Sequence, residues 1–381
     1  MTKPPLHGIT VIEMEGIGPC PMAGMMLADM GARVILVGRK QASDKAAAIH
    51  PDDRQQAFYH RGKESINVDL KHPQGVALVA KLVSQADILL EGFRPQVMER
   101  LGLGPDVLLK ANPKLVYGRL TGWGQDGPLA MAAGHDTNYQ ALSGALYYGG
   151  AQGRVPNAPL TLVGDVGGGT MMLLWGVMNA LWQTQGTGQG QVVDAAMCNG
   201  SAYLSGLLWM MRNTGQISEP AGQGWADGAA PWNQTYTCAD GLHINICALE
   251  PPFYQLLLSK LGLDADALFA KQWDKTSWPL AKAKFTAIFI AQSRDHWCDL
   301  LEGSDACFAP VLSLSEALQH PHNQARKMFW NQQGVDQPAP AVRLQGMEEQ
   351  PKTVADSGAQ GADIVAELGL DWQTLADQGA V

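Results

Sequence analysis

Strands and helices alternate along the first third of the chain. Residues 9–15 alternate well enough for a strand, and residues 22–29 and 33–37 then read as a helix and a second strand. The alternation recurs with strands at 65–70, 87–91 and 115–120 and with helices at 74–84, 95–101 and 105–111. Because strands joined through helices pair in parallel, this pattern predicts an α/β fold with helices on both faces of a parallel sheet.

Longer helices follow in the middle of the chain. The apolar positions predict helices over 136–148, 166–185 and 195–211, with a short strand at 192–194. Residues 213–233 are rich in Gly, Asn, Trp and Pro and poor in aliphatic side chains, which is typical of a linker.

A second domain is expected after the linker. Residues 235–238 and 242–248 read as a strand pair joined by Ala-Asp-Gly, and helical patterns fill about 252–305. Past residue 320 the composition turns to Gln, Ala and Pro. We therefore predict a large domain over 1–212, a linker over 213–233, a smaller α+β domain over 234–320 and a C-terminal segment over 321–381 that returns to the large domain.

The charge is negative overall but unevenly spread. The chain of 381 residues has a net charge of −9, which disfavours nucleic acid as a partner. Residues 1–120 nevertheless carry 15 of the 27 basic residues and 12 of the 36 acidic ones, whereas residues 121–200 contain a single basic residue, Arg154. Either charge simply fluctuates along the chain, or the first third binds a small anion.

Location signals are few. The start of the sequence has no basic segment followed by an apolar run, and the longest apolar run, about 12 residues over 171–182, is too short to span a membrane. The six cysteines show no C-x-x-C spacing and read as reduced thiols. We expect a cytoplasmic protein with no membrane span.

A partial dinucleotide fingerprint follows the first strand. Gly16-Ile-Gly18 lies between a strand and a helix, but the third glycine position holds Pro21, and Gly38 and Arg39 stand where an acidic residue is expected after the second strand. A tight turn explains the two glycines better than NAD or FAD binding does.

Three segments carry candidate acid–base chemistry. Gly134-His135-Asp136-Thr137-Asn138-Tyr139 stands at the start of a predicted helix, Asp165 enters the next helix with a run of glycines, and Glu250 follows a strand. Singly, each residue has an ordinary structural explanation: a helix cap for Asp136 or Asp165, a structural histidine, a surface carboxylate. Together, one imidazole and two carboxylates could transfer a proton.

Several segments, taken in order, resemble the α-methylacyl-CoA racemases of the family III CoA-transferase (CaiB/BaiF) superfamily. The matching stretches are 13–29 (EMEGIGPCPMAGMMLAD), 61–70 (RGKESINVDL), 118–127 (GRLTGWGQDG), 134–139 (GHDTNY), 163–169 (VGDVGGG), 248–254 (ALEPPFY) and 305–312 (DACFAPVL). The resemblance implies a large Rossmann-like α/β domain, a smaller α+β domain and an interlocked dimer of the family III CoA-transferase type, with the active site shared between chains.

The resemblance also assigns roles. His135 and Asp165 would be bases on opposite faces of the substrate α-carbon, and Glu250 of the second chain would pair with His135. The substrate would contact Gly134, Asp136, Thr137, Asn138 and Tyr139, and backbone N–H groups near Asp136 would stabilise the enolate oxygen. No metal or redox cofactor would be needed, because CoA is part of the substrate.

The CoA moiety would lie against the basic first third. The resemblance places Arg39 and the stretch Asn67, Val68, Asp69, Leu70 and Lys71 at the nucleotide. Arg61, Lys63 and Arg94 are further candidates for the phosphates, unless each is only a solvated surface charge. Two positions depart from the family pattern: Gly38 replaces an acidic residue, and Glu64 stands where a basic residue is common.

The Met-rich stretches around Met22–Met30 and Met171–Met178 would either form an adaptable surface for an acyl chain or pack in the core.

Three functions remain open. The first is an isomerase that interconverts (2R)- and (2S)-2-methylacyl-CoA thioesters by α-proton removal. The second is a family III CoA-transferase with Asp165 as nucleophile. The third is a CoA-binding protein without activity. The filled acid–base positions disfavour the third, and His135 favours the racemase over the transferase.

Overall fold

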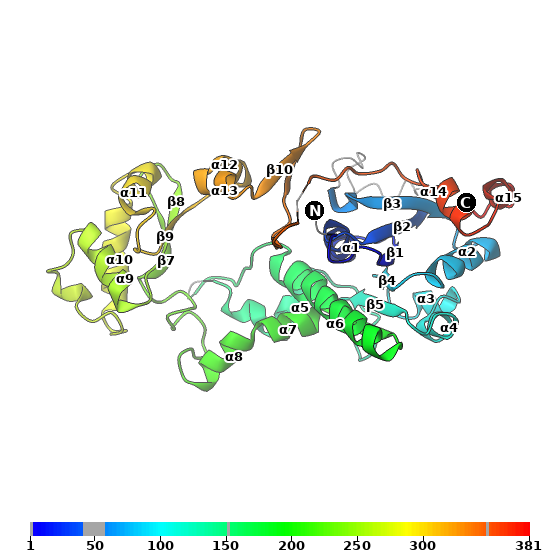
Figure 1. Ribbon diagram of the computed structural model, residues 1–381. Helices are drawn as coiled ribbons and strands as arrows, with labels where there is room; N and C mark the ends of the chain where they lie inside the picture. The colour runs from blue at the N-terminus through cyan, green and yellow to red at the C-terminus, as the bar shows by residue number, and fades with distance from the viewer. Residues whose placement is uncertain (1–2, 41–57, 151–152, 348–349) are drawn as a thin grey trace. The chain divides into compact units, whose positions relative to one another are not determined.

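A computed structural model describes residues 3–40, 58–150, 153–347 and 350–381. These residues form two compact units (Figure 1). Unit 1 consists of Met1–Ser143, Pro159–Leu204 and Gln324–Val381, and unit 2 consists of Gly144–Ala158 and Ser205–Asn323.

A six-stranded parallel sheet forms the centre of unit 1. Its strands lie in the order β3-β2-β1-β4-β5-β6. Their bounds are β1 (Thr10–Met14), β2 (Arg33–Arg39), β3 (Lys63–Val68), β4 (Ile88–Glu91), β5 (Val116–Thr121) and β6 (Gln191–Ala196). The predicted α/β fold with a parallel sheet is confirmed, and the strand order reverses between β1 and β4.

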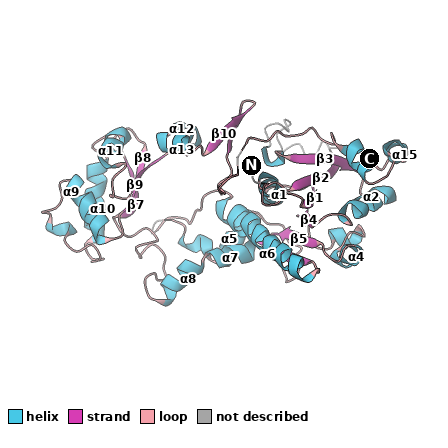
Figure 2. Cartoon of the chain, viewed as in Figure 1, coloured by secondary structure: helices cyan, strands magenta, loops and turns pink. Residues whose placement is uncertain are grey.

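Helices cover both faces of this sheet (Figure 2). They are α1 (Pro19–Asp29), α2 (Pro73–Val83), α3 (Val97–Arg100), α4 (Pro105–Ala111), α5 (Asp136–Ser143), α6 (Met172–Thr187), α7 (Met197–Leu204), α14 (Gly361–Glu367) and α15 (Trp372–Asp377), with a 3₁₀ turn η1 (Phe58–His60) and a π-helix η3 (Leu162–Met171). Alternate strand residues face the two layers: Val11 packs with Leu27 and Leu173, and Ile12 packs with Leu78 and Val365.

The long helices predicted in the middle of the chain are each divided into two elements. The helix expected over 136–148 is α5 followed by a 3₁₀ turn η2 (Ala145–Tyr148), with Gly144 between them at φ 85°. The helix expected over 166–185 begins as η3 and continues as α6. The helix expected over 195–211 is interrupted at Ser205, between α7 and α8 (Gly206–Asn213).

Residues 324–381 pack onto unit 1 and contain elements that the sequence patterns did not predict. The hairpin β10 (Phe329–Gln332) and β11 (Val335–Pro338) is followed by α14 and α15, which pack on the face of the sheet that carries Ile66 and Val68. The backbone N–H of Asp69 donates to the carbonyl of Ala380 at 2.9 Å. Residues 361–380 therefore cover the part of the sheet next to β3.

Unit 2 contains an antiparallel sheet with helices packed against it. Its strands lie in the order β7-β8-β9. The elements are β7 (Asn233–Thr237), β8 (His243–Cys247), β9 (Phe308–Val311), α8, α9 (Pro251–Lys260), η4 (Ala267–Phe269), α10 (Trp278–Phe289), α11 (Arg294–Leu301), α12 (Leu314–Gln319) and, at the edge of the unit, α13 (Pro321–Ala325). The core is rich in aromatic side chains, including Trp232, Phe285 and Phe289. None of the helices in the described ranges is long and apolar enough to cross a membrane.

Candidate active site

The candidate site lies at the carboxyl ends of the parallel strands in unit 1. In open α/β sheets, ligands bind where the strand order reverses, which here is between β1 and β4. The start of α1, just beyond β1, contacts η3 there, because Thr170 Oγ1 donates to the carbonyl of Pro19 at 2.8 Å. The sheet topology thus brings the segment that carries Asp165 to this edge.

Asp136 joins the two helix starts that carry the predicted bases. It is the first residue of α5 and is buried. Its Oδ1 accepts the backbone N–H groups of Gly164 and Asp165, both at 2.9 Å. Its Oδ2 accepts the backbone N–H of Thr161 at 3.2 Å and the side-chain amide of Gln140, through Nε2, at 2.8 Å. The carboxylate therefore caps the π-helix η3 rather than its own helix, and it fixes the segment after His135 against the segment of Asp165.

His135 precedes α5 and is exposed. Its backbone N–H donates to Asn138 Oδ1 at 3.0 Å, and its carbonyl accepts the N–H of Asn138 at 2.8 Å, so the loop before the helix is fixed at both groups. Within the described residues, the N–H groups of Asp136 and Thr137 have no acceptor, as is usual for the first turn of a helix. They remain available to an oxyanion, as the sequence predicted for this helix start.

Asp165 is half-buried, and no described residue donates a hydrogen bond to its carboxylate. Burial raises its pKa above the ordinary value, the negative charge of Asp136 raises it further, and His135 partly offsets the rise. His135 and Asp165 therefore interact electrostatically within unit 1. A carboxylate with a raised pKa is a stronger base than an exposed one, which suits proton abstraction.

Two aromatic rings, those of Trp123 and Tyr139, support the turn at Gly134 and His135. Trp123 and Tyr139 contact edge to face with 4.8 Å between ring centroids, and the Tyr139 hydroxyl donates to the carbonyl of Gly134. A Cβ at Gly122 would lie 2.3 Å from the Tyr139 ring, so only glycine fits there. Tyr139 is thus a support for the Gly134–His135 turn.

Tyr59 is a neighbour of Asp165 that the sequence analysis missed. Burial raises the pKa of its phenol, and the charge of Asp165 raises it further. Tyr59 lies in η1, far from Asp165 in sequence and without a motif of its own, so nothing in the pattern pointed to it. Trp123 lies within the matched 118–127 stretch but was not singled out.

Glu250 lies in unit 2. It is exposed and occupies the position just before α9, where its side chain makes no cap hydrogen bond. Its charge, after the larger effect of burial, contributes to a raised pKa of Cys247. The structure thus groups His135, Asp136 and Asp165 in unit 1, and it leaves the predicted pairing of Glu250 with His135 as a prediction.

The predicted nucleotide contacts lie on neighbouring strands. Arg39 and Val68 are Cα partners at the ends of β2 and β3. Arg39 and Lys71 are exposed, whereas Val68 is buried. Asn67 Oδ1 accepts the Ser357 hydroxyl at 3.0 Å, so part of this stretch is held by the C-terminal segment.

Arg94 is exposed in the loop after β4. The pKa of Tyr139 is raised by burial and by Asp165, and Arg94 counters that rise, which places the Arg94 charge near the α5 start.

Arg61 and Lys63 are not phosphate ligands, and that prediction is wrong. Arg61 is 2% exposed and forms a bidentate pair with Asp29 at 2.6 and 3.1 Å. Lys63 is also buried, and its Nζ donates to both oxygens of Glu13 at 2.8 and 2.6 Å. Both cations are neutralised inside unit 1. The Arg61–Asp29 pair connects the start of β3 to α1, and the Lys63–Glu13 pair connects β3 to β1.

The two departures from the family pattern have local explanations. Glu64 accepts two hydrogen bonds from Arg33, at 2.9 and 2.7 Å, so its charge is paired within the unit. A Cβ at Gly38 would lie 2.6 Å from Asn67 Oδ1, so the absence of a side chain lets Asn67 approach β2. Across the described ranges, no group of three or more His, Cys, Asp or Glu side chains could hold a metal ion.

Comparison with known proteins shows the family of this chain. Residues 6–359 match the CoA-transferase family III. The alpha-methylacyl-CoA racemases of Mus musculus and Homo sapiens are 40% and 41% identical to this chain, each over 97% of it and 95% of the relative's length. The crystal structure of a CaiB/BaiF family protein from Brucella suis superposes with a TM-score of 0.84 at 26% identity, covering 96% of this chain and 100% of that one. This chain belongs to the CoA-transferase family III.

Proposed function

We propose that the protein is an isomerase that interconverts (2R)- and (2S)-2-methylacyl-CoA thioesters. The observation that carries the proposal is the Asp136 carboxylate, which holds the start of the Asp165 helix beside the turn of His135. Two similar proteins that match nearly the whole chain are alpha-methylacyl-CoA racemases, and this supports the same chemistry here.

The proposed reaction needs two bases and an anion site. One base takes the α-proton as the C–H bond breaks, and the electron pair moves onto the thioester oxygen. The other base, in its protonated form, returns a proton to the opposite face of the α-carbon. We assign these roles to His135 and Asp165, and we assign stabilisation of the enolate oxygen to the N–H groups of Asp136 and Thr137.

The CoA moiety is proposed to lie along the carboxyl ends of β2, β3 and β4. Arg39, Lys71 and Arg94 are exposed cations at these ends, and a CoA phosphate is an acceptor that guanidinium and ammonium groups bind well. Asn67, Asp69 and Leu70 would line the nucleotide between them. Gly134, Asn138 and Tyr139 would shape the turn that meets the thioester.

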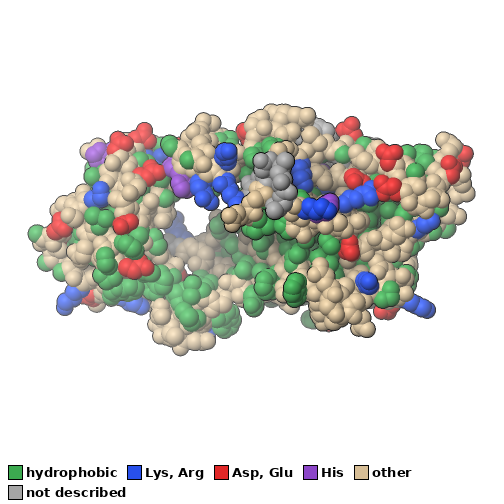
Figure 3. Space-filling view, viewed as in Figure 1, with side chains coloured by type: hydrophobic (Ala, Val, Ile, Leu, Met, Phe, Trp, Pro, Cys, Tyr) green, Lys and Arg blue, Asp and Glu red, His purple; other side chains and the backbone are tan. Residues whose placement is uncertain are grey.

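We further propose a homodimer in which the second chain supplies Glu250 to His135. One face of α6 supports an interface, because Trp175 and Trp182 are 69% and 78% exposed and Met171 and Met178 lie on the same helical face. Hydrophobic side chains reach the surface of unit 1 in the region of α6 (Figure 3). A contiguous exposed apolar face of this kind is typical of a protein–protein interaction site.

No metal or redox group takes part in the proposed reaction, since only a proton is removed and returned. Activity should therefore survive dialysis against EDTA. A cytoplasmic site of action is part of the proposal and rests on the six cysteines, none of which forms a disulfide.

The deciding experiment is incubation of one 2-methylacyl-CoA epimer in D2O. We expect formation of the other epimer, with deuterium at the α-carbon of the product. No exchange, together with CoA transfer to a free carboxylic acid, would instead establish a transferase with Asp165 as nucleophile. Replacement of His135 by Ala should remove most of the exchange, and an unchanged rate would refute its role.

A further inference from the structure

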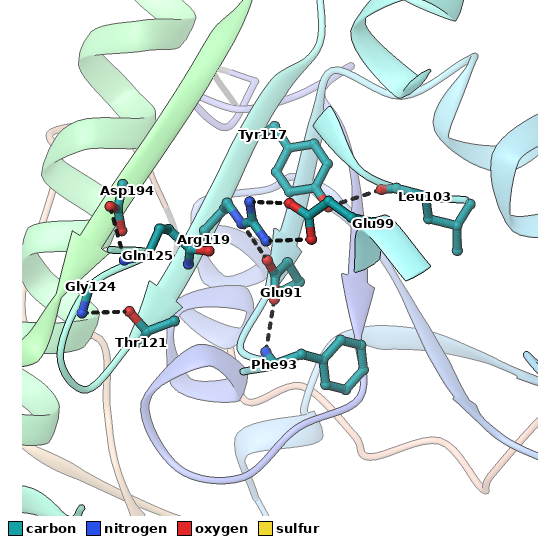
Figure 4. Close-up of polar contacts among 10 residues, drawn as sticks. All are labelled: Glu91, Phe93, Glu99, Leu103, Tyr117, Arg119, Thr121, Gly124, Gln125 and Asp194. Atoms are coloured by element: carbon teal, nitrogen blue, oxygen red, sulfur yellow. Dashed lines mark hydrogen bonds and ion pairs between the residues drawn. The ribbon is translucent and has the colours of Figure 1, made fainter. Parts of the chain in front are cut away.

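Three neighbouring strands of the large sheet carry one charged residue each at the same level. Glu91 on β4 is the Cα partner of Arg119 on β5, and Arg119 is the Cα partner of Asp194 on β6. Partners in a parallel sheet point to the same face, so the side chains form a row of carboxylate, guanidinium and carboxylate (Figure 4). We call Glu91, Arg119 and Asp194 the charged row.

The centre of the row is a buried ion pair. Arg119 Nε donates to Glu91 Oε1 at 2.7 Å, and its two Nη groups donate to Glu99 at 2.7 and 3.2 Å. The side chain of Glu91 is 0% exposed and that of Arg119 is 6% exposed. Desolvation offsets much of the attraction in such a pair, so stability alone is a weak reason for its presence.

Each carboxylate of the row also holds a loop that leaves the sheet. Glu91 Oε2 accepts the backbone N–H of Phe93 at 2.8 Å, and Asp194 Oδ2 accepts that of Gln125 at 3.4 Å. Burial raises the pKa of both carboxyls, and these N–H bonds and Arg119 oppose the rise. The row therefore fixes the loop after β4 and the loop after β5 at their first turns.

Both loops lead to the candidate site. Phe93 is followed by Arg94, whose charge acts on Tyr139, and Gln125 is two residues beyond Trp123, which packs against Tyr139. We propose that the charged row positions these two loops for acyl-CoA: Arg119 fixes Glu91, Glu91 sets the loop of Arg94, and Asp194 sets the loop of Trp123. The inference rests on the proposed function, and the three residues act as positioning residues that do not touch the substrate.

The test compares Glu91→Gln and Asp194→Ala with a matched control. Both carboxylate oxygens of Glu91 accept a hydrogen bond, one from Phe93 and one from Arg119. Glutamine has only one acceptor oxygen, so either Arg119 or the Phe93 N–H loses its partner. The control is Glu64→Gln, which weakens a bidentate pair with Arg33 in the same sheet, away from both loops. For each full-length protein we would measure the Kd of CoA by calorimetry, KM and kcat of α-proton exchange, and Tm.

The expected results separate the two loops. Glu91→Gln should raise the Kd of CoA and the KM about tenfold while kcat stays within about twofold, because it releases the Arg94 loop. Asp194→Ala should lower kcat and leave the Kd of CoA unchanged, because it removes the acceptor of the Gln125 N–H and so releases the Trp123 loop. Glu64→Gln should change Tm only.

Other outcomes would overturn the inference. If Glu91→Gln lowers Tm but binds CoA as the wild type does, the row is only structural. If Glu91→Gln does not fold, Arg119→Lys replaces it as the test variant. Lysine keeps the positive charge but lacks the planar guanidinium that donates to Glu91 and Glu99 at once, and an unchanged Kd of CoA again refutes the positioning role. A wild-type protein that binds no CoA would instead refute the proposed function, independently of the variants.

Discussion

The carboxylate of Asp136 accepts the backbone N–H of Asp165 at 2.9 Å, so one predicted substrate contact holds the helix start of a predicted base. Asp136→Ala removes the acceptor of three backbone N–H groups and should destabilise the protein by about 3 kcal/mol. It should also lower exchange far more than the lost stability explains, because Asp165 is no longer fixed. Urea unfolding and deuterium incorporation at a temperature where the variant is folded measure the two effects.

A second capping aspartate provides the control for this prediction. Asp371 caps α15 by accepting the N–H of Thr374 at 2.7 Å, on the opposite layer from the candidate bases. Asp371→Ala should lower stability and leave the exchange rate of the folded protein unchanged. Equal loss of activity in both variants would show that the Asp136 effect is only a loss of fold.

Asp165→Asn should stabilise the protein while removing activity. The raised pKa means that the folded protein binds this proton more tightly than the unfolded chain does. The stabilising contribution of the protonated form is therefore complete below the ordinary pKa of 3.8 and is lost as the pH rises through the raised pKa, so at pH 7 the ionised group costs stability. Thermal unfolding from pH 3.5 to 8 should show a higher Tm for the variant at neutral pH and convergence in acid.

The raised pKa of Asp165 also sets where the rate falls on the acid side of the pH–activity profile. In the direction in which Asp165 takes the proton, the rate should fall as the pH drops through a pKa above 3.8. Single-turnover rates from each epimer between pH 4 and 8 measure this limb. A limb at the ordinary carboxylate value would contradict the base role in that direction.

Gly122→Ala should damage the site without touching either base. The added methyl group would meet the Tyr139 ring at 2.3 Å, and a packed ring has little room to retreat. Displacement of Tyr139 breaks its hydrogen bond to the Gly134 carbonyl and loosens the turn of His135. We expect exchange to fall about tenfold or more, since small misplacements of reacting groups are costly.

The matched control is Gly206→Ala in α8. No atom lies within 4 Å of a Cβ built at Gly206. Alanine there should raise the free energy of unfolding by about 0.5–1 kcal/mol and leave exchange unchanged, because it only improves helix propensity. A loss of activity in this variant as large as that in Gly122→Ala would exclude a specific role for the Tyr139 contact.

Two inactive variants should restore activity to each other if the site is shared between chains. Co-expression of His135→Ala with Glu250→Ala forms mixed dimers, in which one site regains both native residues and the other loses both. Random pairing makes half of the dimers mixed, so about a quarter of the wild-type activity should return. Exchange assays on the unfractionated co-expressed protein measure it, and mixed dimers isolated through two different tags should show about half of the wild-type activity; no recovery would place both residues of a site on one chain.

Hydrophobic periodicity predicted most of the elements of unit 1. The strand at 9–15 is β1, and the helix at 105–111 is α4 with the same bounds. Both faces of the sheet are covered, so its central strands are runs of buried apolar residues such as Val34–Val37, which the sequence shows clearly. The hairpin β10–β11 and the helix α14 were missed, and for α14 the reason is that its few apolar residues, Ile364 and Val365, pack against strands distant in the sequence.

Motifs pointed to the candidate acid–base residues but not to what each one contacts. His135 and Asp165 stand where helices begin, and the structure places both in unit 1. Asp136 looked like a cap of its own helix and instead caps the next one, a contact across 29 residues that spacing does not encode. Arg61 and Lys63 looked like surface cations because a sequence does not reveal the distant carboxylates that neutralise them.

The contact between Asp69 and Ala380 has a consequence for synthesis of the protein. Strand β3 leaves the ribosome early, but the side of the sheet near it is covered only when residues 357–380 have been made. Until then Ile66 and Val68 lack part of their cover, so the nascent large unit exposes apolar surface for most of its translation. Folding of unit 1 can therefore be completed only once residues 357–380 have left the ribosome.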